Sequence, residues 1–294
     1  MIRYIFRLLA LFLPFLPGKT VLAQTQSSDK SLLWQISGKG MKKPSYIFGT
    51  IHEICSTDFF WTDAMNNSLS SSDKLCLEMD LDDTAALVRG MGALMDPGKK
   101  LSSYFTEPQY SRLVKYAADS MGMTEPMIMY MKPVTIMMMF VQESTAGCAT
   151  PVSYEEKIMS TAKLDNKEVI GLETMQEQAD ALSSIPVDTV VKYILKALNN
   201  EAADAGDDTF DDLVMAYKAQ DIAKLYDLIA ASDALGSANG ALIDDRNRRW
   251  IGRMTKLMNV GESVFFAVGA GHLSGKSGVI NLLRKQGYLV SPVH

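Results

Sequence analysis

Short apolar runs alternate along this chain with longer amphipathic stretches. Apolar runs of a few residues bounded by glycine, proline or polar clusters are typical of β-strands. The first two, Leu32–Ile36 and Ser45–Phe48, flank a turn rich in glycine, lysine and proline, which predicts a β-hairpin. Four further runs predict strands at Lys74–Met79, Lys167–Leu172, Ser263–Val268 and Tyr288–Val290.

In the segments between these strands, apolar residues recur at helical spacing. This spacing predicts helices at Asp63–Leu69, Thr84–Met95, Glu107–Met121, Glu125–Gln142, Tyr154–Leu164 and Lys276–Gln286, and a helical region from Gln176 to Met258. We expect Pro133 to kink the helix that contains it, and Ser153 to cap the helix that follows it. The pattern as a whole predicts a mixed α/β (α+β) fold. Its central mixed β-sheet is built from two pseudo-symmetric halves and flanked by helices, with a helical block in the middle of the chain.

The N-terminus has the features of a secretory signal peptide, which predicts export. Arg3 and Arg7 precede an apolar run at Leu8–Leu16, and small residues at Val21–Ala23 form a cleavage site. We therefore expect a signal peptide at residues 1–23, a disordered lead-in at residues 24–30 and a single domain at residues 31–294. The mature protein would be periplasmic or secreted from a bacterium, without a stable membrane span.

Composition narrows the class of partner. The formal net charge is −5, and removal of residues 1–23 would make the chain more acidic still. An acidic chain without a basic stripe argues against a nucleic-acid partner. Cys55, Cys76 and Cys148 allow at most one internal disulfide, for which Cys55–Cys76 is the pairing to test, and three buried thiols are the alternative. The sequence leaves the oligomeric state open.

Both internal histidines end a strand in the same way. Gly49-Thr-Ile-His52 follows the second predicted strand, and Gly269-Ala-Gly-His272 follows the penultimate one. The third histidine, His294, is the last residue. Two other predicted strands end in an acid, at Glu78 and Glu173. Because ligand sites in α/β sheets gather beyond the carboxyl ends of strands, these four side chains are expected to converge on one cleft.

Two imidazoles and two carboxylates are the usual components of a hydrolytic metal site. They bind Zn²⁺, Mn²⁺ or Co²⁺, and an open coordination position makes a water nucleophilic. Glu78 and Glu173 are then candidates for a ligand and a general base. The alternative is that the acids form salt bridges and the histidines make hydrogen bonds in the core.

Arg246 and Asn247 lie inside a predicted helix at Ala241–Met258. Arg246 could polarise a substrate carbonyl or grip a carboxylate, and Asn247 could orient a ligand or an amide. A solvated basic helix face, paired with Asp244 or Asp245, explains the pattern equally well.

The sequence of the segment Ala270–Ser277 is close to the motif of a phosphate-binding loop. Its first position is alanine where that loop needs glycine, and too little chain follows for the remaining strands. We therefore expect no nucleotide partner.

These motifs together resemble the TraB/GumN family, which includes the Tiki metalloproteases. The resemblance rests on the two Gly-x-x-His motifs, on Leu77-Glu-Met79, on Gly171-Leu-Glu-Thr174 and on Asp244-Asp-Arg-Asn247. It covers the chain from about Leu32 onward and implies an α/β fold with a sheet of two related halves. For Tiki-like members it also implies peptide cleavage that depends on a divalent metal.

The function predicted from the sequence is that of an exported metal-dependent hydrolase, a peptidase acting on peptide or protein substrates. Its divalent metal, Mn²⁺, Zn²⁺ or Co²⁺, would be held by His52, Glu78 and His272. Glu173, Arg246 and Asn247 would be the catalytic residues. The alternative is a non-catalytic periplasmic protein that binds a peptide, haem or another small ligand in the same cleft.

Overall fold

The computed structural model describes residues 30–144, 150–199, 201–231, 238–259 and 261–294. The predicted signal peptide, the lead-in up to residue 29 and Cys148 lie outside these residues.

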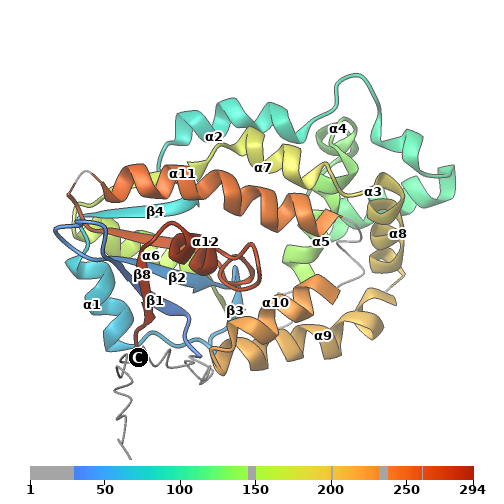
Figure 1. The fold of residues 1–294 in the computed structure, drawn as a ribbon. Helices are drawn as coiled ribbons and strands as arrows, with labels where there is room; N and C mark the ends of the chain where they lie inside the picture. Colours follow the sequence, from blue (N-terminus) through green and yellow to red (C-terminus); the bar gives the residue numbers. More distant parts are fainter. Residues whose placement is uncertain (1–29, 145–149, 200, 232–237, 260) are drawn as a thin grey trace, which may run out of the picture.

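A six-stranded mixed sheet forms the centre of the fold (Figure 1), in the order β6-β4-β7-β2-β1-β8. Its strands are β1 (Leu33–Ser37), β2 (Ser45–Thr50), β4 (Lys74–Met79), β6 (Glu168–Glu173), β7 (Val264–Gly269) and β8 (Leu289–Pro292). The predicted hairpin is confirmed, because β1 and β2 pair antiparallel with Leu33 opposite Phe48. A separate ribbon joins β3 (Ile54–Cys55) to β5 (Pro151–Val152).

Four neighbouring strands of this sheet run parallel. β4 pairs in parallel with both β6 and β7, and β7 pairs in parallel with β2. β1 is antiparallel to both of its neighbours, β2 and β8. A parallel strand covered on both faces has an almost continuous apolar sequence, and β7 is buried at every residue from Val264 to Val268. The carboxyl ends of β6, β4, β7 and β2 therefore lie side by side.

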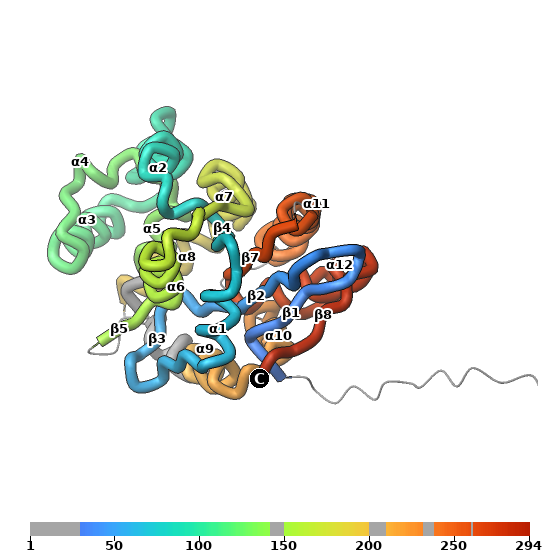
Figure 2. The backbone as a smooth tube through the Cα atoms, turned by 90° about the vertical axis from the view of Figure 1, so that its left-hand side faces the viewer, coloured from blue at the N-terminus to red at the C-terminus, as the bar shows by residue number. Residues whose placement is uncertain are grey.

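Helices cover both faces of the sheet, as Figure 2 shows. On one face lie α1 (Asp63–Ser71) and α6 (Tyr154–Leu164), and on the other lie α11 (Arg246–Met258) and α12 (Val279–Lys285). The helices α9 (Glu201–Lys218) and α10 (Ile222–Ala231) lie together below the sheet in the view of Figure 1. This three-layer arrangement and the mixed sheet confirm the predicted fold class.

The block of helices from the middle of the chain lies to one side of the sheet (Figure 1). It contains α2 (Thr84–Gly90), η1 (Met91–Leu94), η2 (Leu101–Tyr104), α3 (Glu107–Met121), α4 (Glu125–Ile128), α5 (Pro133–Ser144), α7 (Met175–Leu182) and α8 (Val187–Leu198). The block has its own apolar core, which includes Leu113, Ile136 and Ile194. Leu242 belongs to this second core, although it comes only four residues before Arg246.

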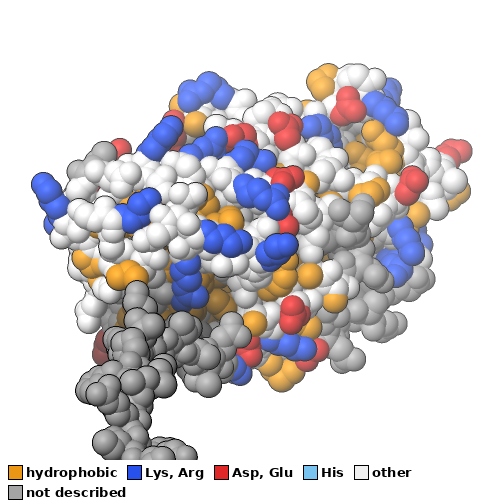
Figure 3. Space-filling view, in the orientation of Figure 1, with side chains coloured by type: hydrophobic (Ala, Val, Ile, Leu, Met, Phe, Trp, Pro, Cys, Tyr) orange, Lys and Arg blue, Asp and Glu red, His pale blue; other side chains and the backbone are white. Residues whose placement is uncertain are grey.

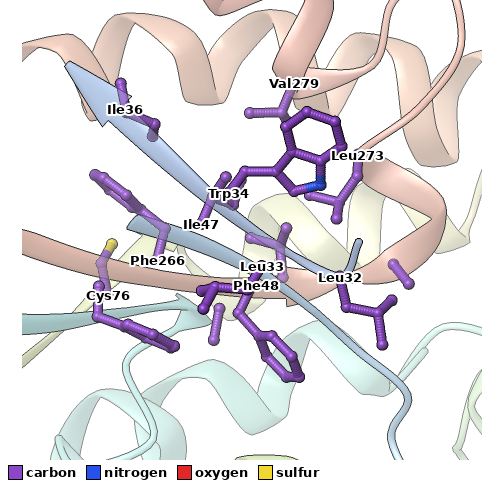
Figure 4. Close-up of a cluster of buried hydrophobic side chains, with 14 of the residues drawn as sticks. Leu32, Leu33, Trp34, Ile36, Ile47, Phe48, Cys76, Phe266, Leu273 and Val279 are labelled. Atoms are coloured by element: carbon purple, nitrogen blue, oxygen red, sulfur yellow. The ribbon is translucent and has the colours of Figure 1, made fainter. Parts of the chain in front are cut away.

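The main core surrounds the sheet (Figure 4), where Trp34, Phe48 and Phe266 are among the buried side chains. Cys76 is fully buried in β4, and its thiol donates a 3.8 Å hydrogen bond to the carbonyl of Leu77. Cys76 forms no disulfide with any described residue, so the Cys55–Cys76 pairing is wrong. Cys76 faces the sheet core, whereas Cys55 lies in the peripheral β3–β5 ribbon.

Three predicted helices are divided in the structure, of which Thr84–Met95 forms α2 and the 3₁₀ turn η1. The stretch Glu125–Gln142 forms α4 and α5, and Pro133 is the first residue of α5 rather than a kink. Proline is tolerated in the first turn of a helix because that turn has no intrahelical acceptor for its N–H. The predicted helix Ala241–Met258 is divided into η4 (Gly240–Asp245), a π-helical turn, and α11. Such wide turns often occur at functional sites.

The surface carries interspersed charges. On the face that α11 and α12 present, basic side chains predominate and acidic ones are scattered among them (Figure 3). In the described part of the chain, no helix combines the length and the apolar character needed to cross a bilayer.

Candidate functional site

Residues from the ends of β4, β6 and β7 meet on the N-terminal turn of α11. Glu78 and Glu173 lie at the carboxyl ends of β4 and β6, and His272 lies in η5 (Ala270–His272), directly after β7. Arg246 and Asn247, the first two residues of α11, are both buried and point at these groups. The structure therefore brings five of the six predicted site residues into one connected set.

The guanidinium of Arg246 is the centre of this network. Its Nε donates to both oxygens of Glu173, at 3.0 and 3.2 Å, and its Nη2 donates to Glu173 Oε1 at 2.6 Å and to Glu78. Its Nη1 donates to the carbonyl of Leu242 and lies 3.1 Å from Nε2 of His272. One cation thus bridges the ends of three parallel strands.

The same network sets the charges of the acids. Burial opposes ionisation of Glu78, but the charge of Arg246 and a 2.8 Å hydrogen bond from the N–H of Gly269 outweigh it and lower the pKa of Glu78 to about 2. Burial likewise works against a charged Arg246, but Glu78 and Glu173 raise its pKa. Both partners are therefore charged at neutral pH, in an interior where an unpaired charge would be costly.

The tautomer of His272 follows from its neighbours. The amide nitrogen of Asn247 donates to the carbonyls of His272, at 3.2 Å, and of Ser277, at 2.9 Å. This orientation turns Oδ1 of Asn247 toward Nδ1 of His272, at 2.7 Å, so that Nδ1 carries the proton. Burial lowers the pKa of His272 to about 3, and the ring is neutral at neutral pH. Its Nε2 therefore presents a lone pair, which accepts a hydrogen bond from Nη1 of Arg246 at 3.1 Å, and Glu78 Oε1 lies 3.9 Å from the same nitrogen.

His52 lies apart from this buried set. It follows β2 in a loop, its side chain is 80% exposed, and its Nδ1 is 3.4 Å from Oε1 of Glu155 in α6. The hydrogen bond with Glu155 raises the pKa of His52, although water screens so exposed a pair. Because His52 follows the carboxyl end of β2, which is parallel to β7, it lies at the same end of the sheet as the buried set.

Sequence reasoning missed three contributors to the site. Trp250 donates from Nε1 to Glu173 Oε2 at 3.1 Å, and its ring centroid is 4.5 Å from that of His272. Gln178 of α7 donates to Glu78 at 3.4 Å, and Glu155 accepts the hydrogen bond from His52. The buried residues of α11 recur every three or four positions, and this periodicity could have placed Trp250 beside Arg246.

Two grooves on the surface differ in their relation to the site. The larger, of about 690 Å³, lies between η2 and α8 and is lined by none of the site residues. The smaller, of about 350 Å³, is lined by Glu177 and Asp180 of α7 and by Asp245 and Arg249 beside Arg246. Of these two grooves, the smaller is therefore the one beside the site.

The donor types at the site fit a divalent metal. A metal-binding histidine normally donates its other ring N–H to an oxygen, and Nδ1 of each internal histidine faces such an acceptor, Asn247 Oδ1 or Glu155 Oε1. However, Nη1 of Arg246 donates a hydrogen bond to Nε2 of His272, so the lone pair of this nitrogen is already engaged. Among the residues that the structure describes, no three His, Cys, Asp or Glu side chains are already gathered as a metal centre.

The fold and site define a class of α/β proteins with buried acids and a histidine at the ends of adjacent parallel strands. Residues 32–292 match the TraB/PrgY/gumN family, and the chain belongs to that family. A relative named Metalloprotease TIKI2, from Danio rerio, is 23% identical over 320 residues, which cover 90% of this chain and 61% of the relative. The chain thus spans about 61% of the length of this curated relative. No solved structure matches the chain significantly.

Proposed function

We propose that this protein is a metal-dependent hydrolase that cleaves peptide bonds. His52, Glu78 and His272 would hold a divalent ion, Mn²⁺, Zn²⁺ or Co²⁺. Glu173, Arg246 and Asn247 would support the reaction. Family membership and the similarity to a metalloprotease agree with this proposal.

One observation carries the proposal: each internal histidine has Nδ1 directed at an oxygen acceptor. This leaves Nε2 of both rings as the nitrogen for a ligand, which is the usual arrangement around protein-bound metals. His272 is moreover held neutral by burial, so its Nε2 can bind a cation without first losing a proton, once Nη1 of Arg246 has moved away from it. When bound, the ion would supply the Lewis acidity that hydrolysis requires.

The network suggests distinct roles for the other three residues. Asn247 fixes the tautomer of His272. Arg246 is a permanent positive charge that can hydrogen-bond the carbonyl oxygen of a scissile peptide group. Both oxygens of Glu173 accept hydrogen bonds from Arg246, and Oε2 also accepts one from Trp250, which favours a role in positioning Arg246 over a role in proton transfer.

The test combines metal content with peptide cleavage. Purified protein should contain a stoichiometric divalent metal by elemental analysis and should cleave an unstructured peptide library. Cleavage should stop on addition of chelator and return with Mn²⁺, Zn²⁺ or Co²⁺. His52→Ala and His272→Ala should each abolish metal uptake, whereas His294→Ala, which removes the exposed C-terminal imidazole, should leave uptake and cleavage unchanged.

Two outcomes would point elsewhere. Normal metal uptake by both His52→Ala and His272→Ala would show that these residues are not the ligands. Retention of a peptide or haem without cleavage, unaffected by chelator, would identify a ligand-binding protein.

The signal-like N-terminus leads us to propose also that the protein acts outside the cytoplasm. Expression of the full chain in a bacterium, followed by cell fractionation and N-terminal sequencing, should find a periplasmic or secreted form that begins at Gln24. Cytoplasmic protein with an intact N-terminus would refute export.

A further inference from the structure

Thr50 has a buried hydroxyl that the fold leaves without a partner. It is the last residue of β2 and the second residue of the Gly49–His52 motif, and it is 3% exposed. Its Oγ1 forms no hydrogen bond with any described residue. Buried hydroxyl groups are nearly always hydrogen-bonded, because burial without a partner costs free energy. An exception at this position needs an explanation.

The sheet register shows which way Thr50 points. Thr50 pairs with Gly269 across the parallel β2–β7 ladder. Paired residues of neighbouring strands direct their side chains to the same face, and the strands lie about 4.8 Å apart. A side chain at position 269 would therefore point the same way as the side chain of Thr50.

A side chain that pointed this way from position 269 would contact the site. A Cβ built on Gly269 would lie 3.4 Å from Oε1 of Glu78 and 3.6 Å from Cδ2 of His272. Thr50 thus lies one strand away from the point where the carboxylate and the imidazole meet. Because position 269 carries no side chain, nothing from that residue stands between the hydroxyl and this pair.

We propose that Thr50 is a substrate-contacting residue whose hydroxyl hydrogen-bonds the peptide group bound beside Glu78 and His272. This inference rests on the proposed function. A threonine hydroxyl can both donate and accept, so it can bind either the carbonyl oxygen or the N–H of a peptide group. Thr50 would retain an unsatisfied hydroxyl in the free protein because the substrate supplies the partner.

Three variants test this role. Thr50→Val replaces the hydroxyl by a methyl group of similar size, and Thr50→Ser keeps the hydroxyl while removing the methyl group. Tyr288→Phe is the matched control, because Tyr288 carries another buried hydroxyl without a described partner. Tyr288 directly precedes β8, which is separated from β7 by β2 and β1.

We expect Thr50→Val to have a Tm equal to or above that of the wild type, since it removes an unsatisfied polar group. Its kcat/KM for peptide cleavage should fall by about tenfold or more, with metal content unchanged. Thr50→Ser should retain most of the activity, and Tyr288→Phe should match the wild type. A Thr50→Val variant that cleaves at the wild-type rate would overturn the proposal, as would an equal loss of activity in Thr50→Ser.

The experiment separates this inference from the proposed function. If the wild type cleaves no peptide, the proposed function fails, and the role of Thr50 is then decided by retention of the peptide library on immobilised protein. Weaker retention by Thr50→Val than by the wild type and Thr50→Ser would support the contact. Equal retention by all three, including none at all, would exclude it.

Discussion

Asn247 and His272 are locked to each other by two hydrogen bonds that run in opposite directions. Oδ1 of Asn247 accepts from Nδ1 of His272 at 2.7 Å, and its Nδ2 donates to the His272 carbonyl at 3.2 Å. The two residues are adjacent in space although α11 and η5 lie on either side of β7 in the chain. The pair therefore fixes both the tautomer and the orientation of the imidazole.

Replacement of Asn247 by alanine should weaken metal binding by about 10–100-fold, because loss of an outer hydrogen-bond partner of a metal-binding histidine has effects of this size. Isothermal titration with Mn²⁺ or Zn²⁺ measures the change. Asn281→Ala is the control, since Asn281 is an amide in α12 that hydrogen-bonds only the nearby Lys276 carbonyl among the contacts described. Equal affinities for the two variants would refute the role of Asn247.

Loss of the Arg246 charge should destabilise the fold. Arg246→Met leaves the buried carboxylate of Glu173 and the partly buried one of Glu78 without their cation, and breaking a buried ion pair from one side costs about 3–5 kcal/mol. Urea unfolding at neutral pH measures the free energy of unfolding. Arg248→Met should change it by less than about 0.5 kcal/mol, because Arg248 is 55% exposed. Similar stabilities of the two variants would show that the buried network contributes little.

The pH dependence of stability should reveal the ion pair between Glu177 and Arg253. The hydrogen bond from Arg253 lowers the pKa of Glu177 from an ordinary 4.5 to about 2. A carboxyl with a lowered folded-state pKa stabilises the fold above its unfolded-state pKa and loses this contribution as pH falls through the folded-state pKa. Glu177→Gln should therefore be less stable than the wild type by a constant amount above about pH 5, and the difference should shrink toward pH 2. Glutamine also suits the capping position of Glu177 at the start of α7, so the variant isolates the charge.

Chemical denaturation of both proteins between pH 3 and pH 7 measures this difference. Asp188→Asn, at an exposed position in the first turn of α8, is the matched acid-to-amide control. A difference between Glu177→Gln and the wild type that does not change with pH would rule out the charge as its cause.

The motif glycine Gly49 should not tolerate a side chain. A Cβ at this position would lie 2.7 Å from Cδ1 of Leu273 and 3.0 Å from the backbone of Ala270, so that η5 would have to move. Gly49→Ala should lower the free energy of unfolding by about 1–3 kcal/mol, as overpacking usually does. Gly252→Ala should instead raise it by about 0.5–1 kcal/mol, because Gly252 is exposed within α11 and a Cβ there would meet no atom within 4 Å. Thermal unfolding of the two variants compares them directly, and a neutral Gly49→Ala would contradict the close packing at the motif.

Most of the fold could be predicted from local patterns. The hairpin and the strand ends at Glu78 and Glu173 follow from short apolar runs whose boundaries are set by glycine and charged residues. The pairing of β7 between β2 and β4 could not be predicted, because strand order depends on contacts between residues almost 200 positions apart. The start of α5 at Pro133 was missed because proline both interrupts helices and begins them.

The candidate site could be predicted by residue type but not by arrangement. Strand-end positions indicate Glu78, Glu173 and His272. For Arg246 the sequence favours neither a role in the site nor a place on a solvated helix face. That Arg246 would bridge both acids depends on how far α11 reaches over the sheet, which no local pattern records. Glu155 lies in the first turn of the predicted helix Tyr154–Leu164, where acids are common, so no local pattern singles it out as a partner of His52.

The central position of β7 has a consequence for biosynthesis. A nascent chain that has not yet reached Val264 lacks the strand that lies between β2 and β4, and it also lacks His272. In such a chain nothing joins β2 to β4, so His52, which follows β2, and Glu78 of β4 are not brought together. The proposed hydrolytic centre is therefore absent until residues 264–272 have been synthesised, so a product that terminates before them would have no such activity.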